Sequence, residues 1–138
     1  MLLLDTNVIS EVMRIRPDPA VSAWLRKHPR NELWTASVVV AELLAGVALL
    51  AKGSKKRALG EAVEGVIGED FRGQILRFDL PAARHYAQIR ASRQHIGRPI
   101  REVDAMIAAI TLTNAAVLAT RNTRDFEHCG IKVVNPWL

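Results

Sequence analysis

Four acidic residues occur in segments of the chain that are otherwise mostly apolar or neutral. They are Asp5 after the apolar run 1–4, Glu42 within the apolar segment 38–45, Asp104 before the apolar segment 105–110, and Asp125 beside Phe126 in 121–126. Removing an ionised carboxylate from water is costly unless the group is paired or binds a metal. A metal site shared by all four acids would account for their positions.

Each acid also has an ordinary structural interpretation. A lone Asp at a strand-to-helix turn, such as Asp5, most often caps the helix. Asp104 could complement a helix dipole, and Asp125 could be a turn residue. Glu42 is the hardest to explain in this way, because no basic residue lies within one helical turn of it. The set of four is therefore more specific than any single member.

The ligand types favour a hard cation. Carboxylate oxygens select Mg²⁺ or Mn²⁺ over zinc, and neither a thiolate nor a suitably spaced histidine accompanies them. The single cysteine, Cys129, cannot form an internal disulfide. Such an ion would activate a water molecule and neutralise charge on a phosphate. We expect Asp5 and Asp104 to bind the metal directly, and Glu42 and Asp125 to bind it directly or through water.

Composition favours one intracellular domain. The chain has 138 residues, of which 49% are hydrophobic, and residues 1–138 are expected to form a single domain. No apolar stretch approaches the roughly 20 residues that span a membrane. The apolar N-terminal run is short and lacks a preceding basic region, so a secretory signal is not expected. We expect a cytoplasmic protein.

The charge distribution points to a polyanionic substrate. The net charge is +5, so the rest of the molecule carries +9 when the four acids are set aside. A basic shell around an acidic metal pocket suits nucleic acid, although surplus basic residues also serve solubility. Six arginines are weak candidates for phosphate contacts, and a solvated surface explains them nearly as well. They are Arg84, Arg90, Arg93, Arg98, Arg101 and Arg121.

Short apolar segments alternate with helical patterns along the chain. Strands are predicted at about 2–4, 33–36, 75–78, 117–120 and 132–134, and helices at about 7–13, from 19 onward, 38–50, from the break at 53–57 to 67, 81–96 and 102–113. This alternation predicts an α/β fold with a parallel sheet and helices on both faces. Its site should lie beyond the carboxyl ends of the strands. The helix at 38–50 is apolar all round apart from Glu42 and should be buried on every side.

Four sequence segments resemble the PIN domain ribonucleases, and within them VapC toxins of the FitB type. They are LLDTNVISE at 3–11, AELLAG at 41–46, DAMIAA at 104–109 and ATRNTRDF at 119–126. The resemblance implies a PIN-like three-layer α/β/α fold with a central parallel sheet. It also implies a Mg²⁺- or Mn²⁺-dependent endoribonuclease whose acidic core is Asp5, Glu42 and Asp104, with Asp125 as the fourth acid.

The same resemblance implies supporting residues and partners. Thr6, Asn7 and Thr120 match polar positions beside the acids, and Thr120 and Asn122 are expected to orient the metal ligands. Some relatives carry a further acid at the position of Asn122, which leaves open whether one metal or two would bind. The implied partners are RNA, an antitoxin with a DNA-binding domain, and a second copy of the chain. An alternative function is a non-catalytic subunit of a DNA-bound repressor complex.

Overall fold

A computed structural model describes residues 1–138. Its centre is a sheet of five parallel strands in the order β3-β2-β1-β4-β5. The strands are β1 (Leu2–Leu4), β2 (Leu33–Ala36), β3 (Ile75–Leu76), β4 (Val117–Ala119) and β5 (Lys132–Val134). Leu3 and Leu118 are fully buried at the middle of the sheet. The predicted α/β class and parallel sheet are confirmed.

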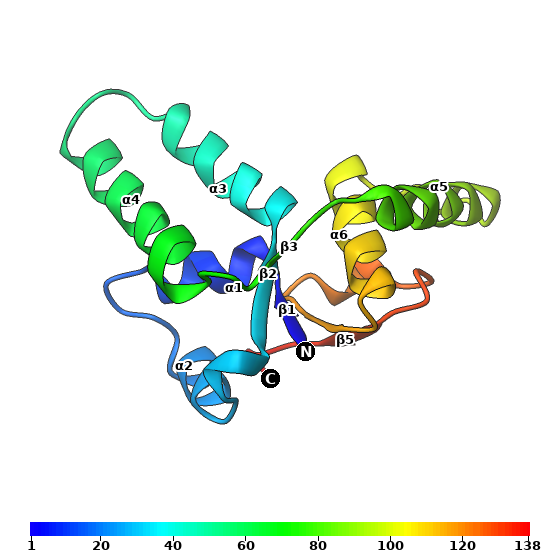
Figure 1. Ribbon diagram of the computed structural model, residues 1–138, viewed down its shortest axis with the longest axis horizontal. Coiled ribbons are helices and arrows are strands. Elements are labelled where there is room, and N and C mark those ends of the chain that lie inside the picture. Colours follow the sequence, from blue (N-terminus) through cyan, green and yellow to red (C-terminus); the bar gives the residue numbers. More distant parts are fainter.

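Six α-helices complete a three-layer α/β/α arrangement, with helices on both sides of the sheet (Figure 1). They are α1 (Thr6–Val12), α2 (Pro19–Arg26), α3 (Ser37–Ala48), α4 (Ser54–Gly65), α5 (Leu80–His95) and α6 (Glu102–Thr113). Short 3-10 turns occupy Arg30–Glu32 and Thr123–Phe126, and a π-helical turn follows α4 at Val66–Asp70. None of the helices has the combination of length and apolarity that a membrane crossing requires.

The order of the strands creates a switch point between β1 and β4. From β1 the chain moves outward through β2 to β3, then returns across the sheet to β4 and β5 on the other side. Right-handed connections place the helices before and after such a reversal on opposite faces of the sheet. In open α/β sheets a ligand site is expected at such a switch point, which here lies at the adjacent ends of β1 and β4, where Leu4 is paired with Ala119.

One strand is shorter than predicted. The sequence indicated a strand at 75–78, whereas β3 ends at Leu76. The only neighbour of β3 is β2, and their pairing ends where Ala36 meets Leu76. The chain of β2 turns into α3 at the next residue, so β3 has no partner for further backbone hydrogen bonds. This limit comes from the neighbouring strand and is invisible in the apolar pattern of β3 itself.

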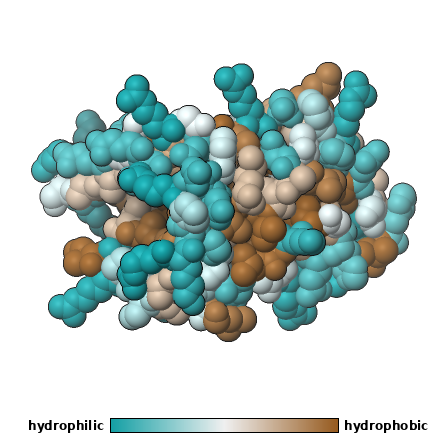
Figure 2. Space-filling view, turned by 60° about the horizontal axis from the view of Figure 1, so that its bottom comes forward, coloured by the Kyte–Doolittle hydropathy of each residue, from teal (hydrophilic) through white to brown (hydrophobic).

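The prediction that the helix at 38–50 is buried on every side is wrong for the single chain. Within α3 only Val39 and Leu43 are buried, and Leu44 is 41% exposed. The reason is geometric, because α3 and α4 form a hairpin that extends away from the sheet (Figure 1). Apolar side chains also gather across the middle of one face of the molecule, framed by hydrophilic ones (Figure 2).

Candidate active site at the carboxyl ends of two central strands

Asp5 lies at the switch point and has two structural roles. Its backbone N–H donates to the carbonyl of Ala119, which extends the pairing of β1 with β4 by one bond. Its Oδ1 accepts from the backbone N–H of Thr6 over 2.7 Å and caps α1, while its Oδ2 accepts from the Thr120 hydroxyl over 2.7 Å. The capping interpretation is therefore confirmed for Asp5, and its second carboxylate oxygen is held by Thr120 at the end of the neighbouring strand.

Thr120 is the centre of a closed hydrogen-bond network. Its hydroxyl donates to Asp5 and accepts from the Asn7 side-chain amide and the Asn122 backbone N–H, each over 3.1 Å. A hydroxyl has one donor and two acceptor positions, so all three are used. The Asn7 amide also lies 3.4 Å from Asp5 Oδ2. Asn122 takes part through its backbone, and its side chain forms no hydrogen bond in this network.

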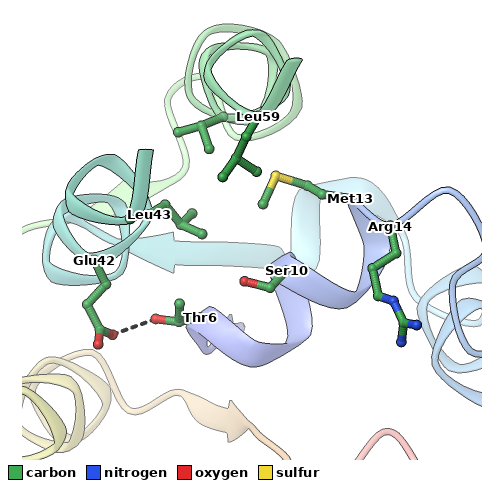
Figure 3. Close-up of a pocket in the computed structure, with 9 residues that line it drawn as sticks. Thr6, Ser10, Met13, Arg14, Glu42, Leu43 and Leu59 are labelled. Carbon is green, nitrogen blue, oxygen red and sulfur yellow. Dashed lines mark hydrogen bonds between the residues drawn. The ribbon is translucent and has the colours of Figure 1, made fainter. Parts of the chain in front are cut away.

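Glu42 reaches the site from α3. Its Oε1 accepts from the Thr6 hydroxyl over 2.6 Å, joining residues 36 positions apart, as Figure 3 shows. Because Thr6 directly follows Asp5, this bond places the Glu42 carboxylate beside the Asp5 network. The hydroxyl of Thr6 thus links the first turn of α1 to the middle of α3.

Asp104 comes from the first turn of α6, where a negative charge suits the helix dipole. The residue is only 9% exposed, and burial, which outweighs the other influences, raises the pKa of its carboxyl to about 6. Arg101 opposes this rise, whereas the charges of Asp5, Asp125 and Glu42 add to it. The structure therefore brings all four predicted acids into one electrostatic neighbourhood.

The four acids differ in their contact with solvent. Asp5 is 5% exposed, and burial raises the pKa of its carboxyl, although hydrogen bonds from Thr120 and Thr6 counteract the effect. Glu42 is half-buried and Asp125 is exposed. The expectation that every one of these carboxylates is removed from water is thus correct for Asp5 and Asp104 and wrong for Asp125, which lies in a surface 3-10 turn.

The four carboxylates are the type of ligand that a hard cation prefers, although they do not lie close enough together to hold one ion. No three His, Cys, Asp or Glu side chains form a group that could hold a metal ion as they are placed. Asp104 is nevertheless a mostly buried carboxylate that receives no hydrogen bond, and such a group gains from a bound cation. The residues present are chemically suited to Mg²⁺ or Mn²⁺, and binding would require the carboxylates to close around the ion.

A pocket beside Glu42 was not anticipated from the sequence. It has a volume of about 260 Å³ and lies between α1, α3 and α4 (Figure 3). Thr6 and Glu42 form its polar end, and Met13, Leu43 and Leu59 line its apolar part. Met13 follows the end of α1, Leu43 lies in α3 and Leu59 lies in α4, and the three share no motif. Only the tertiary packing brings them together.

The candidate phosphate-binding arginines have different surroundings. The prediction that Arg93 contacts phosphate does not fit the structure. Arg93 is 4% exposed, and its guanidinium donates to the carbonyls of Arg98, Asp125 and Glu127 at 2.7 to 3.0 Å. Every one of these acceptors is a backbone oxygen, so Arg93 joins the end of α5 to the loop that carries Asp125. It is a structural residue whose Nε and Nη1 groups already donate within the protein.

The other candidates lie at the surface with different neighbours. Arg90 pairs with Glu102 over 3.6 Å, and Arg98 pairs with Glu127 over 2.9 Å, which lowers the pKa of that Glu127 carboxyl. The three that are exposed and form no ion pair are Arg84, Arg101 and Arg121.

The arrangement of fold and site agrees with comparisons to known proteins. A model of the PIN domain family matches residues 2–132, and the chain belongs to this family. It is 44% identical to the toxin FitB of Neisseria gonorrhoeae over 137 residues, covering 99% of each chain. It is 37% identical to a VapC ribonuclease of Sinorhizobium fredii, covering 99% of this chain and 98% of the relative.

A solved structure of FitAB bound to a DNA fragment contains a similar chain. The two superpose with a TM-score of 0.92 at 43% identity, and the match covers 100% of this chain and 96% of the other. The predicted PIN-like fold and the resemblance to VapC and FitB proteins are therefore confirmed.

Proposed function

We propose that this protein is the toxin of a toxin-antitoxin pair and acts as an endoribonuclease that depends on Mg²⁺ or Mn²⁺. The observation that carries the proposal is that four carboxylates from distant segments lie in one electrostatic neighbourhood, with Asp5 at the switch point of the parallel sheet. The similarity to a VapC ribonuclease supports cleavage of RNA, and the similarity to FitB supports a role as a toxin.

Asp5 and Asp104 are the residues that would bind the metal directly, with Glu42 and Asp125 binding it directly or through water. When bound, Mg²⁺ or Mn²⁺ supplies a water molecule of lowered pKa and neutralises charge on the scissile phosphate. Asp5 suits its role because Thr6 and Thr120 fix both of its oxygens. Asp104 suits it because its carboxylate is free of hydrogen bonds.

The remaining groups act on the ligands and on the substrate. Thr6 orients Glu42, and Asn7 supports Thr120, so the acids keep their directions while a phosphodiester approaches. Arg101 lies near enough to oppose the rise that burial causes in the pKa of both Asp5 and Asp104, which favours the ionised forms that bind metal. Its exposed guanidinium also favours the approach of a phosphate.

Cleavage of purified RNA tests the proposal directly. The protein should cut RNA in Mg²⁺ or Mn²⁺ and leave it intact in EDTA. Glu102→Gln is a matched control for Asp104→Asn, because Glu102 lies in the same helical turn but is exposed and pairs with Arg90. Cleavage should persist in Glu102→Gln and fall by orders of magnitude in Asp104→Asn. RNA that stays intact with every metal tested would contradict the enzyme.

An antitoxin segment that covers the acids would keep the toxin inactive. The pocket between α1, α3 and α4 would accept an apolar side chain, and its polar end at Glu42 adjoins the acids. An arginine or lysine of the segment could then neutralise the carboxylates in place of the metal. Leu59→Lys, at the apolar end of the pocket, should weaken inhibition and preserve cleavage. A complex in which the four acids remain open to solvent would contradict this mode.

A DNA-bound complex is a second candidate function, because the FitAB structure contains DNA. In a purely non-catalytic subunit the acids would not be needed for chemistry. Operator binding by the toxin-antitoxin complex should then be unaffected by Asp104→Asn, and purified toxin should not cleave RNA. Loss of RNA cleavage in Asp104→Asn with intact DNA binding would mean that the chain serves in both roles.

A further inference from the structure

Arg121 is tied to the acidic site through its backbone. It directly follows Thr120 at the end of β4, and its backbone N–H donates to the Asn7 side-chain oxygen over 3.1 Å. The amide nitrogen of the same Asn7 side chain donates to Thr120. One asparagine thus fixes the backbone of Arg121 relative to the hydrogen bonds that hold Asp5.

The side chain of Arg121 lies against the ring of Trp137. The guanidinium carbon is 5.1 Å from the ring centroid, an arrangement typical of a cation–π contact. A planar guanidinium that stacks through one face keeps the N–H groups of its edge available. Arg121 is exposed and forms no ion pair with a carboxylate. Its charge is therefore positioned and not neutralised.

Trp137 is held by its backbone and by packing. Its backbone N–H donates to the Asn135 side chain over 2.9 Å, and its ring packs against the hydrophobic core. The indole Nε1 is buried without a hydrogen-bond acceptor, which is uncommon for tryptophan. The position of the ring is thus not set by an indole hydrogen bond. What the ring provides at this position is a surface for Arg121.

Arg101 and Arg121 have different electrostatic surroundings. Arg101 is the arginine whose charge lowers the pKa of both Asp5 and Asp104, so part of its charge is offset by these acids. Arg121 is directed toward the ring of Trp137 instead. A nucleic acid strand with one phosphate at the acids would therefore meet an uncompensated guanidinium on the residue that directly follows Thr120.

We propose that Arg121 binds a phosphate of the RNA strand that neighbours the phosphate at the acidic site, and that Trp137 is the platform that positions it. This inference rests on the proposed ribonuclease function. Arg121 is a substrate-binding residue in this account, and Trp137 is a positioning residue that acts through it. The expected ligand group is a single phosphodiester, recognised by charge and by the guanidinium N–H groups.

Binding of a fluorescein-labelled single-stranded RNA of mixed sequence tests the inference. Fluorescence anisotropy is measured over a series of KCl concentrations, with every variant built on Asp104→Asn so that the RNA is not cut. Removing one phosphate contact to a single strand should reduce the slope of log K against log salt by about 0.7. Arg121→Gln should show this change, with affinity lowered roughly two- to tenfold at moderate salt.

Three further variants test whether RNA binding depends on the position of the Arg121 guanidinium or only on its charge. Lys132→Gln removes the same charge from an exposed residue at the amino end of β5. The acids lie at the carboxyl ends of the strands, so this variant should leave the slope unchanged. Trp137→Phe keeps a ring and should bind RNA nearly as well as the parent. Trp137→Leu should weaken binding about two- to threefold, and adding it to Arg121→Gln should cause no further loss, since contacting residues are not additive.

The outcomes distinguish this inference from the proposed function. If Arg121→Gln behaves like Lys132→Gln while the wild type cleaves RNA, the phosphate contact is wrong and the ribonuclease stands. If Trp137→Leu and Arg121→Gln are additive, the platform is wrong. If Arg121→Gln weakens only antitoxin binding, the contact serves a protein and the inference is overturned. If the parent does not bind RNA and the wild type does not cleave it, both proposals fail.

Discussion

The Thr120 hydroxyl donates to Asp5 Oδ2 over 2.7 Å and joins two residues that lie 115 positions apart in the sequence. The bond spans the switch point between β1 and β4, so it fixes Asp5 with respect to the second half of the chain. The same hydroxyl accepts from Asn7 and from the backbone of Asn122. The Thr120 side chain therefore fixes the orientation of Asp5, of the Asn7 amide and of the loop that leads to Asp125.

Thr120→Val keeps the shape of this side chain and removes its hydrogen bonds. Cleavage should fall about 10- to 100-fold, because Asp5 loses the donor that orients it. The metal concentration needed for half-maximal activity should rise, since the Thr120 hydrogen bond also lowers the pKa of the Asp5 carboxyl. Cleavage assays over a magnesium titration provide the measurement. An unchanged magnesium requirement would show that Thr120 does not act through Asp5.

Asp104→Asn should move activity and stability in opposite directions. Cleavage should decrease by orders of magnitude because a charged ligand is lost. The metal-free protein should be at least as stable as the wild type, because a buried carboxylate repelled by Asp5, Asp125 and Glu42 has been neutralised. Thermal melts in EDTA, paired with cleavage assays in Mg²⁺, measure both effects. A large loss of metal-free stability would assign Asp104 a structural role.

The raised pKa of Asp104 predicts how metal-free stability depends on pH. The pKa of the folded carboxyl is about 6 and the ordinary value is 3.8, so the folded state holds its proton more tightly than the unfolded state. The stability from this proton is fully present below pH 3.8 and is lost as the pH rises through about 6. It amounts to about 3 kcal/mol at most. Melts of wild type and Asp104→Asn in EDTA should diverge over this interval.

Protons should also compete with the metal for this carboxyl. Cleavage should decline as the pH falls through about 6, and raising Mg²⁺ should move the midpoint to lower pH because the ion binds the ionised form. Pre-steady-state cleavage measured at several Mg²⁺ concentrations and pH values tests this competition. A midpoint that is independent of Mg²⁺ would assign the pH dependence to another group.

Arg93 should be important for stability. Arg93→Met would remove a buried guanidinium and leave the carbonyls of Arg98, Asp125 and Glu127 without their donor. The loss should be about 3 kcal/mol or more. Arg90→Met is the control, because that arginine is exposed and its ion pair with Glu102 is long, so its effect should stay within about 0.5 kcal/mol. Urea denaturation measures both free energies, and equal effects would contradict this role.

The partly exposed α3 bears on the expected homodimer. Leu44 is 41% exposed and Leu49, at the end of the helix, is 86% exposed, so a second copy could cover apolar surface that the sheet does not reach. Light scattering of the antitoxin-free protein should give twice the mass of the chain. Leu44→Glu should shift this value toward the monomer if the α3 surface is the contact. A wild-type monomer at micromolar concentration would contradict the homodimer.

The sequence predicted the site best where an acidic residue directly follows a predicted strand. Asp5 could be placed because the apolar strand before it is short and ends at the acid, and the parallel sheet then predicted which edge it occupies. The role of Thr120 followed from the family resemblance. Arg93 could not be foreseen, because its acceptors are backbone carbonyls, and no side-chain pattern marks a carbonyl as an acceptor. The exposure of Asp125 likewise depends on a turn whose neighbours come from α5.

The position of β1 has a consequence for synthesis of the protein on the ribosome. This strand is made first, yet it lies at the centre of the sheet, with β2 on one side and β4 on the other. Until residues 117–119 leave the ribosome, one edge of β1 has no partner and Asp5 lacks its donor from Thr120. A chain that has not emerged as far as these residues therefore cannot assemble the site. The proposed nuclease would therefore stay inert toward the RNA around it until residues 117–125 have left the ribosome.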